Sequence, residues 1–288
     1  MPHLLQTGPS ARVDSAPLIL WAQRPAETVL PRRNEEAAPP RAPARLVPVA
    51  DDGDGVLTIA DLNRATPMTR ADLGAALAAR PERIIVIGDF HGTSHAPQAL
   101  NAAITATIAR GETVTAGLEI PAQPGWARLV DERNAGRITP DAFRRAFRDT
   151  AQDVYAVGDP RPEFFLNKIE LAFRDGARVA LLDPAPGTPG PADPVMMERA
   201  VEAWRRHGSD RLFIEAGNLH TQSRPGIRAP LDGLGVDGAN PLGRRLESRF
   251  GPAQVLTVAT VPGNVAGPAL FRPPFDTWNA VVRLVPEG

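Results

Sequence analysis

The sequence predicts an α/β protein whose sheet is mixed but largely parallel and is flanked by helices. From Pro81 onward, short apolar runs typical of strands alternate with longer segments of helical spacing, which favours parallel strands joined by right-handed crossovers. Glycines and prolines punctuate these segments. Two copies of a Gly-x-x-His tetrad, at 88–91 and 217–220, each directly follow an apolar run, so both histidines are expected at strand ends.

Residues 1–48 are expected to form an extended arm that is poorly ordered. They are rich in Pro, Ala and Arg, and their apolar residues follow no sustained period. The segment Leu18–Trp21 is the apolar exception, and it has the composition of a single added strand or turn. The arm is therefore predicted to be dispensable for folding.

Residues 49–80 are expected to form an acidic turn followed by a helix. The turn has the spacing of a calcium loop, with acids at its third, fifth and twelfth positions, Asp52, Asp54 and Asp61. The first position is Ala50, which removes one coordinating carboxylate, and no second loop is available to pair with it. An acidic turn is therefore favoured over a calcium site.

The remaining elements belong to one predicted domain, residues 81–288, with a helical insertion over 123–150. Thr69 is a suitable N-cap for the helix that precedes the domain, Pro97 fits a first helical turn, and Gly208 fits a helix end. Helices are expected over 68–80, 97–110, 159–175, 191–207 and 240–250. Strands are expected over 84–88, 113–118, 178–182, 211–215, 254–260 and 279–284.

The composition narrows the classes of partner. With 32 basic and 33 acidic residues, the chain has a formal charge of -1, so electrostatics give no reason to expect nucleic acid. The absence of cysteine excludes thiol nucleophiles, thiolate metal sites and disulfides. Any metal must be held by His, Asp and Glu. The expected partner is a small-molecule or peptide substrate.

No segment of the sequence reads as a membrane span. No apolar run approaches the ~20 residues that a membrane helix needs, and the N-terminus lacks the basic and apolar regions of a secretory signal. The chain is expected to be soluble and cytoplasmic by default, with export left open.

Polar side chains end several predicted strands, and in a parallel sheet they share one edge. Two imidazoles and a carboxylate at that edge suit acid/base catalysis or metal binding. Ordinary turn or helix-cap roles are the alternative. The residues in question are Asp89, His91, Glu119, Asp183, Asn218 and His220.

Other candidate residues give weaker signals. His95 lies near the start of the helix after the first tetrad, where it can face the site or cap the helix. Tyr155 follows the helical insertion, within reach of the site or packed at its rim, and His207 suits a helix C-cap. No nucleophile elbow or phosphate-binding loop is present, which disfavours a serine hydrolase or a nucleotide-binding protein.

Four motifs together resemble the superfamily that joins erythromycin esterases, Tiki-type peptidases and ChaN-like haem-uptake proteins. They are Gly-Asp-Phe-His-Gly-Thr at 88–93, Leu-Glu-Ile-Pro at 118–121, Gly-Asn-Leu-His at 217–220 and Leu-Gly-Arg-Arg-Leu at 242–246. The resemblance spans roughly residues 81–285 and is most similar to the esterase-like branch.

The resemblance implies that His91 and His220 are the functional imidazoles and Glu119 the functional acid. Two positions depart from the family pattern. The family usually has Glu in place of Asp89, and its esterase-like members often have Glu in place of His95. These departures imply either a shift from base catalysis towards metal binding or the loss of one activity.

The leading hypothesis is hydrolysis of an ester or amide. His91 acts as general base on water, Glu119 or Asp89 orients it, and His220 stabilises the oxyanion or protonates the leaving group. The expected substrate-binding side chains are His95, Asp183, Asn218 and Tyr155.

Two alternatives involve a cofactor. In the first, the chain is a haem- or iron-binding protein of the ChaN kind, with a histidine and Tyr155 as ligands. In the second, it is a metal-dependent peptidase of the Tiki kind. Its ligands for a divalent metal (Mn, Co or Zn) would be Asp89, His91, Glu119 and His220.

Overall fold

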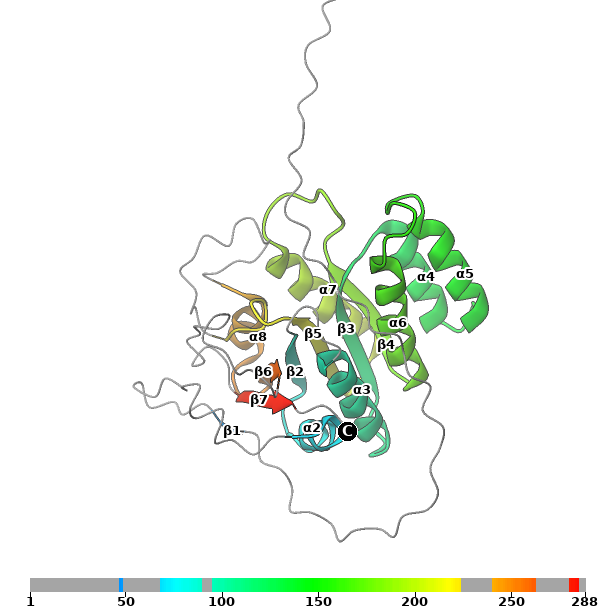
Figure 1. Ribbon diagram of the computed structural model, residues 1–288. Coiled ribbons are helices and arrows are strands. Elements are labelled where there is room, and N and C mark those ends of the chain that lie inside the picture. The colour runs from blue at the N-terminus through cyan, green and yellow to red at the C-terminus, as the bar shows by residue number, and fades with distance from the viewer. Residues whose placement is uncertain (1–46, 49–67, 90–94, 224–239, 263–279, 285–288) are drawn as a thin grey trace, which may run out of the picture. The chain divides into compact units, whose positions relative to one another are not determined.

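The computed structural model describes residues 47–48, 68–89, 95–223, 240–262 and 280–284, all within one compact unit of the chain (Figure 1). The described helices are α2 (Arg70–Ala78), α3 (His95–Ile108), α4 (Pro124–Asn134), α5 (Pro140–Ala151), α6 (Arg161–Arg174), α7 (Ala192–His207) and α8 (Leu242–Phe250). The described strands are β1 (Val47–Pro48), β2 (Ile84–Asp89), β3 (Val114–Pro121), β4 (Arg178–Asp183), β5 (Arg211–Gly217), β6 (Val255–Pro262) and β7 (Ala280–Leu284).

These strands form one sheet in the order β1-β7-β6-β2-β5-β3-β4. Neighbours from β7 to β4 pair in parallel, and only β1 pairs antiparallel, against β7. The prediction of a mixed, largely parallel sheet flanked by helices is therefore confirmed. The register of the two central strands pairs Asp89 with Gly217, so the two tetrads begin side by side.

Local signals explain most element boundaries. Thr69 caps α2 by accepting a hydrogen bond from the Asp72 amide at 3.1 Å, and Thr139 caps α5 in the same way. α7 ends at Gly208, whose φ of 62° lies in the left-handed region that glycine tolerates. The caps expected at Thr69 and Gly208 are both present.

Some bounds differ from the expectation. The insertion expected over 123–150 is two helices, α4 and α5, separated by a short turn that includes Gly136. Strand β3 runs to Pro121, three residues beyond its predicted end, because a register shift lets Pro121 pair with Asp183 and the Ala122 amide donate to the Asp183 carbonyl at 2.8 Å. This extension brings Glu119 within the strand instead of after it.

The sheet separates two apolar layers (Figure 1). One layer, here called the α3 face, packs side chains such as Ile85, Leu118 and Phe213 against helices α2 to α6. The other, the α7 face, packs side chains such as Val86 and Ile214 against α7 and α8. Alternate residues of each strand point to alternate faces, so polar residues at strand ends are also divided between the two faces.

Strand β5 lies where the direction of the connections changes. Its neighbours β2 and β3 are followed by helices of the α3 face, whereas β5 is followed by α8 on the α7 face. Such switch points, at the carboxyl ends of parallel strands, are where open α/β sheets place their sites. The second tetrad begins at this point.

No helix within the described part of the chain is both long and apolar enough to cross a membrane. The apolar segment around Trp21 and the acidic turn with Asp52, Asp54 and Asp61 lie outside the described residues.

Candidate functional site

Several of the expected site residues lie together at the carboxyl edge of the sheet. Asp89 ends β2, Glu119 lies near the end of β3, Asp183 ends β4, and Asn218 and His220 follow β5. His91 lies outside the described residues. His95 is the first residue of α3, which agrees with its expected place near the start of a helix. The structure does not describe its side chain.

The His220 imidazole lies between two carboxylates. Its Nδ1 is 2.9 Å from Asp193 Oδ1, and its Nε2 is 3.5 Å from Glu119 Oε1. The shorter contact is a hydrogen bond, whereas the longer one exceeds ordinary hydrogen-bond length and is an ion-pair contact. His220 is buried, and the ring is fixed at Nδ1 while Nε2 faces Glu119.

Backbone contacts hold both partners of His220. The Gly217 amide donates to Glu119 Oε2, which leaves Oε1 facing the imidazole. The fully buried Asp193 accepts a second hydrogen bond at Oδ1, from the Leu242 amide at 2.8 Å. The position of His220 is therefore determined by three separate segments: the end of β3, the first turn of α7 and the start of α8.

The surroundings favour the protonated form of His220. Burial alone lowers its pKa, but the Asp193 hydrogen bond and the charges of Glu119, Asp193 and Asp183 outweigh that effect and raise the pKa above its ordinary value. The imidazolium form of His220 is thus favoured more at the carboxyl edge than in free histidine.

Asp193 is a site residue that the sequence analysis did not identify. It is the second residue of α7, where an acidic side chain is common because it complements the helix dipole. The sequence pattern at Asp193 therefore gave no sign of a role in the site. Its complete burial, in a helix position that is usually solvated, becomes evident only in the folded chain.

A second polar cluster lies at the same edge on the α3 face, formed by Asp89, Glu215 and Lys168. Lys168 Nζ, from α6, is 2.5 Å from Glu215 Oε2, and all three side chains are buried. Glu215 and Lys168 were also not expected in a site. A charged residue inside the apolar run of β5, and the only lysine of the chain, were the two available signals.

The surroundings in this cluster favour the protonated form of Asp89. Burial raises the pKa of Asp89 to about 8, with further contributions from the charge of Glu215, its hydrogen bond to Glu215 and the charge of Glu119, while Lys168 opposes them. When Asp89 is neutral, the positive charge of Lys168 balances the negative charge of Glu215. The buried cluster is then electrically neutral, which limits the cost of burying its charges.

Asp183 adds a further carboxyl to the edge. Burial raises the pKa of Asp183 to about 6, with Glu119 adding to the rise and His220 and Arg199 opposing it. Arg199, another residue not expected here, donates from α7 to the Asp183 carbonyl at 2.6 Å. The acidic groups therefore influence one another's protonation along the whole edge.

The start of the second tetrad is packed tightly against the first. The Asn218 amide donates to the Asp89 carbonyl at 2.9 Å, and its side-chain Nδ2 donates to the Thr260 carbonyl at 3.2 Å. A Cβ on Gly88 would collide with Asn218 Oδ1 and lie 2.7 Å from Thr221 Oγ1. Gly88 therefore serves a close approach to the second tetrad that a side chain would block, and Asn218 has a packing role.

Tyr155 lies in the aromatic group of the helical insertion. Its ring stacks on Trp126, with centroids 5.6 Å apart, and Arg161 lies over it at 4.8 Å. Burial raises the pKa of Tyr155, and Asp183 adds to that rise while a hydrogen bond to Gln123 opposes it. Tyr155 is therefore close enough to the carboxyl edge for the charge of Asp183 to act on its hydroxyl, and the raised pKa favours the protonated hydroxyl.

The described residues include no group of three or more His, Asp or Glu side chains arranged to hold a metal ion. Two of the expected ligands, Glu119 and His220, do converge, and the Asp193 contact to the far nitrogen of His220 is the arrangement typical of metal-bound histidines. A third ligand would have to come from outside the described residues, where His91 lies.

Comparisons with known proteins find no matching family model and no matching curated protein. Similar solved structures include the type III effector HopBA1, at 12% identity over 85% of this chain and 99% of that one, with a TM-score of 0.49. A succinoglycan biosynthesis protein matches at 9% identity over 65% of this chain and 67% of that one, with a TM-score of 0.34. RRSP, a MARTX toxin effector domain from Vibrio vulnificus CMCP6, matches at 18% identity over 56% of this chain and 32% of that one, with a TM-score of 0.31. These values are too low to transfer a function, so the chemistry must be argued from the side chains of this chain.

Proposed function

We propose that this protein hydrolyses an ester or amide bond of a small molecule or peptide at the carboxyl edge of its sheet. The observation that carries the proposal is the His220 imidazole, fixed by Asp193 at one nitrogen and facing Glu119 at the other. The resemblance to the erythromycin esterase, Tiki and ChaN-like superfamily supports His220 and Glu119.

In this proposal His220 is the general acid. The raised pKa favours the protonated imidazole, and Asp193 fixes the orientation of the ring by accepting from Nδ1. No hydrogen bond from Nε2 to another described residue competes for its proton. Nε2 can therefore donate to the leaving group, or to the oxyanion that develops before it leaves.

Glu119 has a positioning and electrostatic role. Its Oε2 accepts a hydrogen bond from the Gly217 amide, and its Oε1 lies 3.5 Å from His220 Nε2. A substrate oxygen or a water that accepts from Nε2 would therefore lie next to Oε1. The negative charge of Glu119 stabilises the imidazolium before the proton is transferred. His91, which lies outside the described residues, keeps the role that the leading hypothesis gives it, the activation of water as general base.

The test uses chromogenic esters and anilides with His220→Gln, Glu119→Gln and the matched control Glu202→Gln, an exposed carboxylate on α7. Loss of the proton-transfer group in His220→Gln should reduce kcat/KM by about 10²–10⁴-fold. Glu119→Gln, which removes the charge that stabilises the imidazolium, should also reduce kcat/KM, and the control should leave it unchanged. Melting curves establish that the variants are folded. Turnover that survives in a folded His220→Gln variant would exclude His220 as the acid.

A metal-dependent peptidase is the second candidate, favoured by the Asp193 contact to His220. Glu119 and His220 would hold a divalent ion, together with a ligand outside the described residues. A bound ion would supply Lewis acidity and lower the pKa of a bound water. Elemental analysis of protein purified without chelator distinguishes this candidate: a stoichiometric metal that His220→Gln loses favours it, and full activity in chelator contradicts it. A Soret band in the purified protein would instead favour the haem-binding alternative.

A further inference from the structure

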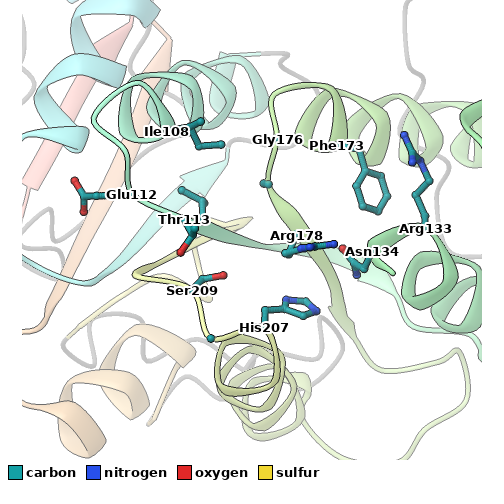
Figure 2. Close-up of a pocket in the computed structure, with 13 residues that line it drawn as sticks. Ile108, Glu112, Thr113, Arg133, Asn134, Phe173, Gly176, Arg178, His207 and Ser209 are labelled. Carbon is teal, nitrogen blue, oxygen red and sulfur yellow. The ribbon is translucent and has the colours of Figure 1, made fainter. Parts of the chain in front are cut away.

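A second polar site lies at the amino edge of the sheet, opposite the carboxyl edge that holds His220. A pocket of about 450 Å³ opens where β3, β4 and β5 begin, between the ends of α4, α6 and α7. Figure 2 shows Arg178 lying across it, with the Phe173 ring on one side and the His207 imidazole on the other. Nothing in the proposed hydrolysis uses this pocket.

Hydrogen bonds hold the walls of the pocket in place without a ligand. The Asn134 side chain bonds the Val179 backbone twice, donating to its carbonyl at 2.8 Å and accepting from its amide at 2.9 Å, which ties the end of α4 to β4. Thr115 Oγ1 contacts His207 Nδ1 at 3.2 Å and Ser209 Oγ at 2.8 Å. The pocket is thus preorganised, which lowers the entropic cost of binding.

The pocket carries an excess of positive charge. Arg133 and Arg178 line it, and an adjoining pocket that shares Arg178 and His207 adds Arg137 and Arg206. Of the nearby acids, Asp131 pairs with Arg206 at 3.2 Å. The other, Glu112, pairs with two arginines outside the pocket, at 3.2 and 3.5 Å.

Helix dipoles explain only part of this charge. Arg133, Arg206 and His207 lie in the last turns of α4 and α7, where cations complement the dipole. Arg178 begins a strand, and within the described residues it makes no ion pair. Its guanidinium is therefore available to a ligand.

The state of His207 reflects the same positive field. Burial lowers the pKa of His207, and so do Arg206 on its own helix and Arg178 on β4, while Asp131 on α4 opposes them. An anion placed beside these guanidinium groups would oppose their effect and raise the pKa of His207.

We propose that the amino-edge pocket binds a small molecule that carries a phosphate group, with Arg178 on the phosphate oxygens and Phe173 against the apolar part of the ligand. The planar fork of an arginine matches phosphate oxygens in pairs, and a dianion suits a site with several uncompensated cations. The volume fits a small monoester, and the Phe173 ring, with Arg133 5.4 Å from its centre, offers an apolar wall.

Calorimetric titration of the full chain with phenyl phosphate tests the proposal, with phenol and benzoate as probes that lack the phosphate. We expect phenyl phosphate to bind and the other two to bind at least about tenfold more weakly. Arg178→Gln should weaken phenyl phosphate by about tenfold or more, whereas Arg145→Gln, an exposed arginine on α5 outside the pocket, should not. Equal binding of phenol or benzoate, or an unaffected Arg178→Gln variant, would overturn the proposal.

The His207 imidazole provides an independent readout. In a pH titration followed by NMR, saturating phenyl phosphate should raise the pKa of His207, because the bound anion favours the protonated imidazole. Inorganic phosphate should produce the same shift at higher concentration. An unchanged His207 titration under saturating phenyl phosphate would place the ligand elsewhere and contradict the assignment.

Discussion

The two polar clusters at the carboxyl edge are both built from charged side chains, but they differ in how closely those charges are paired and how far they are enclosed. The α3-face cluster is enclosed: Lys168 and Glu215 are 8% and 1% exposed, and they contact each other at 2.5 Å. On the α7 face, the buried His220 meets Glu119 at the longer distance of 3.5 Å, and the Glu119 side chain is 17% exposed.

This difference separates stability from chemistry. Charges that satisfy one another inside the fold can hold the edge together but have no capacity left for a ligand. An imidazolium whose Nε2 lacks a close partner, beside a partly exposed carboxylate, retains that capacity. Changes to the α3-face cluster should therefore act first on folding, and changes to the α7-face cluster should act first on turnover.

The largest expected effect is on folding, from Lys168→Met. Removing the only cation of a buried cluster leaves Glu215 unpaired, so the free energy of unfolding should fall by about 3–5 kcal/mol. Chemical denaturation measures the change. Arg144→Met, which breaks the exposed pair between Arg144 and Glu170, is the control and should cost less than about 1 kcal/mol. A double variant, Lys168→Met with Glu215→Leu, should recover much of the loss; continued instability there would show that Lys168 acts through packing.

Asp89→Asn should change how stability depends on pH. The folded pKa of about 8 lies above the ordinary value of about 3.9, so the folded state binds the proton more tightly and wild-type stability falls as the pH rises from about 4 to about 8. An asparagine side chain imitates the protonated carboxyl at every pH, so the variant should not lose stability over this pH range. Between pH 5 and pH 9 the variant should gain roughly 2–4 kcal/mol relative to the wild type. Parallel pH profiles for the two proteins would show that Asp89 does not hold a proton in the fold.

Asp193→Asn should act on turnover more than on folding. Without the Asp193 charge, the pKa of His220 should fall and the ring should lose its fixed orientation, which lowers kcat/KM by about 10–100-fold. The matched control is Asp141→Asn, because Asp141 is also the second residue of a helix but is exposed. NMR titration of His220 distinguishes the two explanations: an unchanged pKa together with lost turnover would assign Asp193 a purely structural role.

The smallest expected effect is that of Asp183→Asn. The raised pKa of about 6 means that wild-type stability falls between about pH 4 and pH 6, but Asp183 is partly exposed, so solvent screening keeps the effect to about 1 kcal/mol or less. Thermal melts at pH 4 and pH 8 measure it. A difference of several kcal/mol would mean that Asp183 belongs with the enclosed cluster.

Short-range patterns in the sequence predicted the alternating elements well. Apolar runs, the Thr69 cap and the Gly208 stop depend on neighbouring residues along the chain, and each was confirmed. The strand-end rule likewise brought Asp89, Glu119, Asp183, Asn218 and His220 to one edge. The rule could not predict on which face of the sheet each side chain lies, because the face depends on strand register. Strand β3, for example, extends to Pro121 through a register shift with β4.

The sequence by itself determined the fold class, the strand ends that carry polar groups and the exclusion of thiol chemistry, because these follow from composition and local periodicity. Only the tertiary structure decided which charges meet. Asp193 on α7 reaches His220 across 27 positions, and Lys168 on α6 reaches Glu215 on β5 across 47. Burial raises the pKa of Asp89, whereas the carboxylates around His220 raise its pKa against the opposing effect of burial. Both effects depend on three-dimensional surroundings that a linear pattern does not contain.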